Sequence, residues 1–205
     1  MDAVEYLRSL PSQHSSMILT DPPYNISLET RGKYAFSGIY DPQKEKDPDH
    51  IDWDSLEFRA APFIEEAKRI LNRRGCMILF VDSFKLTPIY ELLEAADFKN
   101  IRLLTWLKSN PPPFNVGASG YLPSATEHAI FCMKGKQKQS VSPDRHTGIF
   151  EYPKPNRRSR GIYSYASKPI GLLEELILRH TEEGQTIVDP FLGSGSTGIA
   201  ALKQK

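Results

Sequence analysis

The run Cys-Met-Ile-Leu-Phe-Val over 76–81 constrains the fold most, because it is almost continuously apolar. A run of this length and composition is typical of a strand that is covered on both faces, as in a parallel sheet. Helical patterns flank it over 55–72 and 85–96, and the apolar residues of the first pattern share one face. Helices that alternate with strands predict an α/β fold with a mostly parallel sheet and helices on both faces.

The same alternation continues along the rest of the chain. Gly75 is expected to end the connection that leads into the apolar run. We expect a single domain over residues 1–205, because 205 residues suffice for one domain with an ample core. About five strands are visible. The further strands are expected over 15–20, 101–107, 128–133 and 185–189, and the further helices over 4–10, 168–184 and 198–203.

Composition is that of a soluble globular protein, with 40% hydrophobic and 25% charged residues. No apolar stretch approaches the ~20 residues that a bilayer crossing needs, and no cleavable leader opens the chain. Cys76 and Cys132 lie in apolar runs, which indicates reduced, buried thiols of a cytoplasmic protein. The cysteines and histidines show no metal-ligand spacing, so no metal is expected.

A turn with two prolines, Asp21-Pro22-Pro23-Tyr24, follows the strand expected over 15–20. Consecutive prolines allow neither a helix nor a paired strand, so the chain leaves the sheet in a stiff shape. Ligands of open α/β sheets bind beyond the carboxyl ends of the strands. There Asp21 and the Pro22 carbonyl can accept hydrogen bonds from an amino group, and Tyr24 can stack on a flat ring. The alternative is an ordinary strand-ending turn with a capping Asp.

A glycine-rich turn over 190–197 follows Asp189 and leads into the last helix. Gly193, Gly195 and Gly198 match the dinucleotide-binding fingerprint, and glycines permit positive φ and a close approach to a ligand. Ser196-Thr197 stands where a phosphate-cradling loop needs lysine and serine. S-adenosylmethionine fits better, because its carboxylate suits a helix N-terminus and its ammonium group suits Asp189. A nicotinamide-dependent oxidoreductase is the alternative interpretation of this turn.

The segment over 134–166 is rich in lysine and arginine and carries only two acidic residues. The formal net charge of +1 does not decide whether nucleic acid binds, but a local concentration of basic residues is the footprint of a phosphate-backbone partner. The alternative is a solvated charged loop, and then the polar loop over 27–50 becomes the better DNA-contact candidate. The candidate DNA contacts are Arg145, Arg157, Arg158 and Arg160.

With both turns in place, the chain resembles the amino-methylating DNA methyltransferases, which act on adenine N6 or cytosine N4. The two turns carry the resemblance, and residues 106–108, residues 127–131 and Lys168-Pro169 support it. The proline turn comes first, the basic segment lies in the middle and the glycine turn comes last. This order is similar to that of the permuted β group.

The resemblance implies a Rossmann-like, S-adenosylmethionine-dependent methyltransferase that methylates the exocyclic amine of a flipped base in double-stranded DNA. Adenine N6 is favoured over cytosine N4 because the resemblance associates an initial Asp with adenine. The implied catalytic residues are Asp21, Pro22, Pro23 and Tyr24. The implied cofactor-binding residues are Lys168, Pro169, Asp189, Pro190, Phe191, Gly193, Gly195, Ser196 and Thr197.

The chain also departs from the family that it resembles. Members usually continue past the final helix into strands that bind the cofactor's ribose and adenine, and they usually begin with a strand ending near Asp2. We therefore expect a permuted fold that lacks these terminal strands. Asp2 is then either the remnant of an adenine-side contact or a helix N-cap. A non-catalytic DNA-binding remnant of such an enzyme is the alternative function.

Overall fold

The computed structural model describes residues 2–23, 58–111, 124–135, 147–155 and 167–204. The chain divides into two compact units, one of Met1–Asp21 with Ala60–Lys205 and the other of Pro22–Arg59. Every helix and strand described below belongs to the first unit. That residues 1–205 act as a single domain stays a prediction.

The centre of the first unit is a six-stranded sheet with the order β5-β3-β4-β2-β1-β6. The strands are β1 Ser15–Thr20, β2 Leu71–Val81, β3 Lys99–Lys108, β4 Thr126–Met133, β5 Ile149–Tyr152 and β6 Ile187–Val188. The pairs β1–β2, β1–β6 and β3–β5 are parallel, whereas β4 is antiparallel to both β2 and β3. Five strands therefore run in one direction and β4 runs against them, which confirms the mostly parallel sheet.

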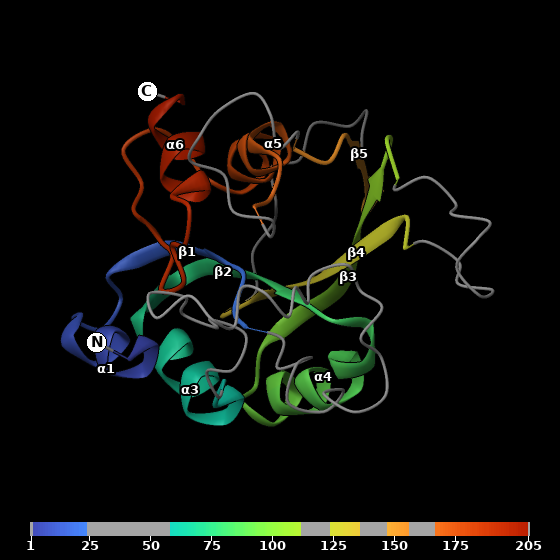
Figure 1. Cartoon of the computed structure of the whole chain (residues 1–205). Coiled ribbons are helices and arrows are strands. Elements are labelled where there is room, and N and C mark those ends of the chain that lie inside the picture. The colour runs from blue at the N-terminus through green and yellow to red at the C-terminus, as the bar shows by residue number, and fades with distance from the viewer. Residues whose placement is uncertain (1, 24–57, 112–123, 136–146, 156–166, 205) are drawn as a thin grey trace, which may run out of the picture. The chain divides into compact units, whose positions relative to one another are not determined.

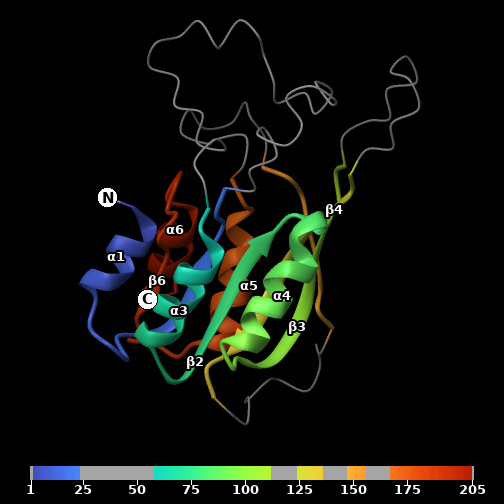
Figure 2. The same ribbon diagram turned by 90° about the horizontal axis from the view of Figure 1, so that it is seen from below.

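Helices cover both faces of the sheet, as predicted. Figure 1 shows α5 (Ile170–His180) and α6 (Ser196–Leu202) on one face, with α3 (Ala60–Ile70) and α4 (Leu86–Ala95) on the other. In Figure 2 α3 and α4 lie in front of the sheet and α5 lies behind it. A short helix α1 (Ala3–Ser9) contacts α3, and a 3-10 turn η3 (Ser83–Lys85) precedes α4. No helix among the residues described here is long and apolar enough to cross a membrane.

The apolar run forms the interior of β2, as its composition predicts. Residues 76–81 are all buried, and β2 lies between β1 and β4. The expectation that Gly75 ends a connection is wrong, because β2 already begins at Leu71. Ser15 pairs with Leu71 but Met17 pairs with Cys76, so an irregularity in the strand absorbs the extra residues. Gly75 lies in it, where a Cβ would come within 2.9 Å of the Leu71 side chain.

Several other boundaries differ from the predictions. The helix expected over 55–72 begins at Ala60 in the structure, and its last expected residues belong to β2. Helix α5 ends at His180 rather than near residue 184, because Thr181 is extended. Helix α6 starts at Ser196 instead of at Gly198. The predicted helix at the N-terminus is confirmed as α1, and Asp2 is its N-cap, accepting from the amides of residues 4 and 5.

Strand β5 was not predicted, because it lies inside the basic segment and carries one buried apolar residue, Phe150. It is held by its neighbours. The Trp106 indole N–H donates to the Tyr152 carbonyl at 2.8 Å, and the Tyr152 hydroxyl donates to Glu175 of α5 at 2.6 Å. Gly171 of α5 permits this approach, since a Cβ there would lie 2.9 Å from the Tyr152 ring. The basic segment is therefore not wholly irregular.

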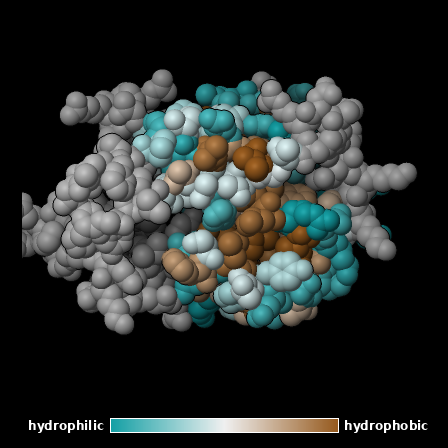
Figure 3. Space-filling view, turned by 90° about the vertical axis from the view of Figure 1, so that its right-hand side faces the viewer, coloured by the Kyte–Doolittle hydropathy of each residue, from teal (hydrophilic) through white to brown (hydrophobic). Residues whose placement is uncertain are grey.

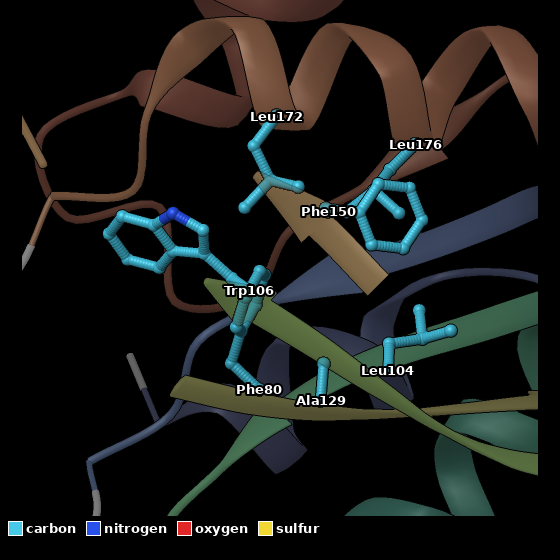
Figure 4. A pocket seen from close by; sticks show the side chains of 7 residues that line it. All are labelled: Phe80, Leu104, Trp106, Ala129, Phe150, Leu172 and Leu176. Atoms are coloured by element: carbon cyan, nitrogen blue, oxygen red, sulfur yellow. The ribbon is translucent and has the colours of Figure 1, made fainter. Parts of the chain in front are cut away.

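The apolar face of α5 that the sequence predicts is confirmed. Its buried residues are Leu172, Leu173, Leu176 and Ile177. Between α5 and the sheet lies a hollow of about 10 Å³, lined only by apolar side chains and shown in Figure 4. It has room for about one water molecule and none for a base or a cofactor. Hydrophobic surface also gathers on the side of the molecule viewed in Figure 3.

The two cysteines are buried and form no disulfide, as predicted. Burial raises the pKa of the Cys76 thiol to about 12 and raises the pKa of Cys132 as well. Both thiols are therefore protonated at neutral pH, and they contribute packing rather than reactivity.

Candidate active site

The two predicted turns follow adjacent strands, at the same end of the sheet. Strands β1 and β6 are parallel, and Ile18 pairs with Val188, so both strands end side by side. The Thr20 hydroxyl donates to Asp189 Oδ1 at 2.7 Å and joins the two strand ends. Asp21 follows β1 directly, and Asp189 follows β6 directly. Asp21 and Asp189 therefore lie at the ends of adjacent strands, beyond the carboxyl ends where ligands of such sheets bind.

Asp189 is an extensively hydrogen-bonded carboxylate. Besides Thr20, the Phe191 amide donates to Oδ1 at 3.1 Å, and the Thr197 hydroxyl also donates to it. Burial raises the pKa of Asp189, these hydrogen bonds partly offset the rise, and the nearby charge of Asp21 adds to it. A cation placed beside Asp189 would therefore be stabilised by a carboxylate that is partly removed from water.

The glycine turn has the backbone that its sequence predicts. Gly193 and Gly195 adopt φ of 51° and 77°, in the left-handed region, and Gly195 is the N-cap residue of α6. Nothing lies within 4 Å of a Cβ placed on Gly195, so its conformation, rather than crowding, requires glycine there. Ser196 and Thr197 are buried in the first turn of α6. The Phe191 ring packs against Phe63 of α3, with ring centroids 5.8 Å apart.

Lys168 lies immediately before Pro169, the N-cap residue of α5, and its side chain reaches Asp21. Its ammonium group forms a hydrogen-bonded ion pair with Asp21 Oδ2 and lies 3.2 Å from Glu127 Oε2. The same nitrogen lies 4.9 Å from the centre of the Phe80 ring. Lys168 was predicted as a cofactor-binding residue, and its ammonium group contacts the candidate catalytic carboxylate and Glu127.

Glu127 continues this set of contacts to a second lysine. Its Oε1 lies 3.1 Å from Nζ of Lys108, the last residue of β3. Lys108, Glu127, Lys168 and Asp21 thus form a row of alternating charges, which we call the buried charge chain. Burial works against the ionised form of Glu127, but the two lysines hold its pKa below the usual value. Burial likewise works against the charge of Lys168, but Asp21 and Glu127 raise its pKa.

Sequence reasoning did not assign a role to Lys108 or Glu127. Both occur in segments that supported the resemblance, and each is a charged residue at the end of an apolar strand. A charged residue at the end of an apolar strand was therefore the sequence signal that could have identified them. Because β4 is antiparallel, the start of this strand lies at the carboxyl ends of β2 and β3, where Glu127 pairs with Trp106 and Val81 pairs with His128.

Other predicted site residues cannot be placed in the same way. Pro22 and Pro23 follow Asp21 and belong to the second compact unit. Tyr24, Arg145, Arg157, Arg158, Arg160 and the polar loop over 27–50 lie outside the described residues. Their roles stay predictions.

The DNA methylase family model matches residues 15–205 of this chain. The chain belongs to the DNA methylase family. The match covers both turns and every member of the buried charge chain. Membership in this family confirms the resemblance and leaves the nicotinamide-dependent oxidoreductase without support.

Two relatives show how the chain aligns with curated enzymes. Type II methyltransferase M2.DpnII of Streptococcus pneumoniae is 28% identical, over 98% of this chain and 79% of its own length. Type II methyltransferase M.HinfI of Haemophilus influenzae is 25% identical, again over 98% of this chain. The chain spans 60% of the length of M.HinfI.

Solved structures confirm the Rossmann-like methyltransferase fold. The structure described as an M1.HpyAVI–SAM complex gives a TM-score of 0.65 at 22% identity and covers 98% of this chain and 85% of that one. PvuII DNA methyltransferase, described as cytosine-N4-specific, gives a TM-score of 0.69 at 16% identity and covers 100% and 77%. At these identities the likeness shows the fold alone.

Proposed function

We propose that the chain transfers a methyl group from S-adenosylmethionine to the exocyclic amine of a base in double-stranded DNA. The observation that carries the proposal is the placement of Asp21 and Asp189 at the ends of adjacent strands, joined through Thr20. One carboxylate then receives the amine and the other receives the cofactor, which brings the two reactants together.

Asp21 serves the chemistry of the amine. The lone pair of an aromatic amine is delocalised into the ring, and accepting its hydrogens helps to return that pair to nitrogen. The nitrogen forms a bond to the methyl carbon while the carbon–sulfur bond breaks, and a proton then leaves the nitrogen. The Pro22 carbonyl is the second acceptor, and Tyr24 stacks on the base. A base inside a duplex cannot enter such a site, so it is flipped out at a cost of a few kcal/mol.

Asp189 and the glycine turn serve the cofactor. S-adenosylmethionine supplies an electrophilic methyl group and carries an ammonium group. Burial raises the pKa of Asp189, so a bound cation stabilises its ionised form and gains more there than at an exposed carboxylate. Gly193 and Gly195 allow the left-handed backbone conformation of this turn, and their lack of side chains permits a close approach of the cofactor. Family membership and the fold shared with the M1.HpyAVI–SAM complex support this donor.

The base that we propose is adenine, methylated at N6. The initial Asp of the proline turn supports this choice, because the resemblance associates it with adenine more often than with cytosine. The fold does not choose between them, since an enzyme described as cytosine-N4-specific shares it. The basic segment, with Arg145, Arg157, Arg158 and Arg160, is proposed to contact the DNA.

The test is direct transfer by the full chain from S-adenosylmethionine labelled in the methyl group to duplex DNA. Digestion to nucleosides followed by mass spectrometry should show N6-methyladenine. Asp21→Asn should strongly reduce transfer, leaving a small residual rate, while retaining most DNA binding, because Asp21 acts on the reacting nitrogen rather than on phosphates. Asp97→Asn is the matched control, since Asp97 is an exposed carboxylate with φ of 59°, which Asn tolerates.

Each result has a separate meaning. Transfer to cytosine would reverse the choice of base but keep the reaction class. DNA binding without any transfer would favour the non-catalytic remnant. Full activity of Asp21→Asn would refute the role of Asp21.

A further inference from the structure

The buried charge chain connects Asp21 to a strand three positions away in the sheet. Lys108 ends β3, Glu127 lies near the start of β4, Lys168 precedes α5 and Asp21 follows β1. In the sheet order, β4 and β2 lie between β3 and β1. The ammonium group of Lys168 contacts both Glu127 and Asp21 and lies 4.9 Å from the centre of the ring of Phe80, a residue of β2.

Neighbouring charges fix the position of each member of this chain. The Lys168 side chain is only 6% exposed, and a buried ammonium group without partners is strongly disfavoured. Lys168 has a carboxylate on each side, and Glu127 has an ammonium group on each side. Lys108 is 9% exposed, so this outer end is also shielded from water. Because the two lysines are shielded from water, these pairs are screened less by salt than fully exposed pairs.

The contacts of Lys168 also distinguish it from the residue before it. Ser167 donates from its hydroxyl to the hydroxyl of Ser194 in the glycine turn, at 2.9 Å. Lys168 instead pairs with Asp21 and Glu127. Ser167 therefore contacts the glycine turn, whereas Lys168 contacts the residue that the proposed function assigns to the base.

We propose that Lys168, held in place by Glu127 and Lys108, is a positioning residue that orients the Asp21 carboxylate for the amine of the base. This rests on the proposed function, because it assumes that Asp21 receives the amine. Lys168 does not react and does not contact the base. It limits the rotation of the carboxylate, so that the acceptor is in place before the flipped base arrives.

The first measurement compares Lys168→Gln with the parent chain in the methyl-transfer assay. A positioning role predicts a loss of about 10- to 100-fold in kcat, since orientation affects the transition state. The Kd for S-adenosylmethionine and the Kd for DNA should change less than about threefold. A Kd for S-adenosylmethionine weakened tenfold or more, with kcat unchanged at saturation, would make Lys168 a cofactor residue and overturn the inference.

A double-mutant cycle tests whether Lys168 acts through Asp21. In the Asp21→Asn background, adding Lys168→Gln should cost less than about threefold in the residual single-turnover rate. The double variant loses one charge of each sign, so it leaves no unpaired lysine at this point. Equal losses in both backgrounds would show that Lys168 acts independently of Asp21 and would refute the proposal.

Strand β3 offers a matched pair of lysines for the outer end of the chain. Lys99 is its first residue and pairs with the exposed Asp97, whereas Lys108 is its last residue and pairs with Glu127. Lys108→Gln should lower kcat about threefold to tenfold, and Lys99→Gln should leave it unchanged. Equal kcat values in the two variants would remove Lys108 from the chain, and this comparison stands even where Lys168→Gln fails to fold.

Unfolding measurements separate failure of this inference from failure of the proposed function. The same four proteins of the Asp21–Lys168 cycle can be unfolded in urea without reference to activity. Coupled losses of stability support the pairing, and additive losses contradict it. A parent chain that transfers no methyl group refutes the proposed function. An active parent whose Lys168→Gln variant keeps full kcat refutes only the positioning role.

Discussion

The role proposed for Asp189 comes at the expense of stability. Its half-buried carboxylate lies near Asp21, and its pKa is raised, so folding disfavours the ionised form. The pH dependence of the free energy of unfolding follows from the direction of this pKa shift. Because the folded pKa lies above the unfolded pKa, protonation favours the folded state, and Asp189 adds stability as the pH falls through its raised pKa. At neutral pH the same group lowers stability.

Asp189→Asn should therefore be neutral or stabilising at pH 7, raising Tm by up to about 4 °C for a chain of this size. An Asn oxygen can still accept from Thr20 and Phe191, while the buried charge is removed. The Kd for S-adenosylmethionine should rise at least tenfold, because the proposed partner of its ammonium group is lost. Thermal unfolding and calorimetry measure the two effects, and a Tm lowered by several degrees would contradict the argument.

The contribution of Glu127 to the free energy of unfolding changes with pH in the opposite direction. Its pKa is lowered by Lys168 and Lys108 against the effect of burial, so its ion pairs stabilise the fold above the unfolded pKa of Glu, ~4.3. This stability is lost as the pH falls through the lower, folded pKa.

Glu127→Gln should destabilise the chain by about 2 kcal/mol at pH 7. This is below the ~3–5 kcal/mol typical of a fully buried pair, because 30% of the side chain is exposed and partly screened. Urea unfolding of parent and variant should show this difference at pH 7 and a progressively smaller one as the pH falls below the unfolded pKa of ~4.3. A difference that stays constant with pH would mean that packing, not charge, holds Glu127 in place.

At the scale of elements, apolar periodicity predicted the parts that packing determines. The buried run of β2 and the four buried residues of α5 were readable because burial dictates residue type there. Strand β5 was not readable, since four residues with one buried side chain leave almost no periodic signal and depend on β3 for their pairing. The irregularity around Gly75 also arises from the pairing of two strands rather than from either strand alone.

The residues of the candidate site likewise divide into those that the sequence predicted and those that it did not. Asp21 and Asp189 were predictable because each follows its own strand in a recognisable turn. Lys108 and Glu127 were not, because their meeting with Lys168 depends on the reversed direction of β4. Strand direction is a property of the assembled sheet, and no local pattern records it.

Helix α5 allows a matched test of the predicted apolar face. Leu173 is 1% exposed and Leu178 is 63% exposed on the same helix. Leu173→Ala should lower the free energy of unfolding by about 2–5 kcal/mol, since it removes buried atoms and leaves a cavity. Leu178→Ala should change it by less than about 0.5 kcal/mol. Denaturant unfolding of both variants checks this, and similar losses would show that α5 packs through a different face.

At the scale of the whole molecule, DNA binding is expected to depend on the basic segment over 134–166. If Arg157 and Arg158 neutralise phosphates, binding should weaken as salt rises, with a slope near −0.9 per contacted phosphate of duplex DNA. Replacing both by Ala should reduce that slope by about two and weaken binding to most sequences alike. A single arginine that reads a guanine would instead cost ~1–3 kcal/mol at one base position.

The control is a second adjacent pair, Arg73 and Arg74, which are exposed in the first half of β2, away from the carboxyl end that faces the site. Replacing both by Ala changes the net charge equally but should leave the salt slope as it is. Binding titrations over a range of salt concentrations decide the matter. An unchanged slope in Arg157→Ala/Arg158→Ala would mean that the segment is a solvated loop and would favour the loop over 27–50.

The charged residues of the candidate site described above carry an excess of negative charge. The site gathers three carboxylates, Asp21, Glu127 and Asp189, around two lysines that are already committed to ion pairs. Under the proposed function, this excess of negative charge among the described residues favours a cationic cofactor and an uncharged base over a phosphate. We therefore expect contacts with the DNA backbone to come from basic residues elsewhere on the chain. Positively charged residues would then attract the DNA, whereas the negatively charged site would admit the uncharged base.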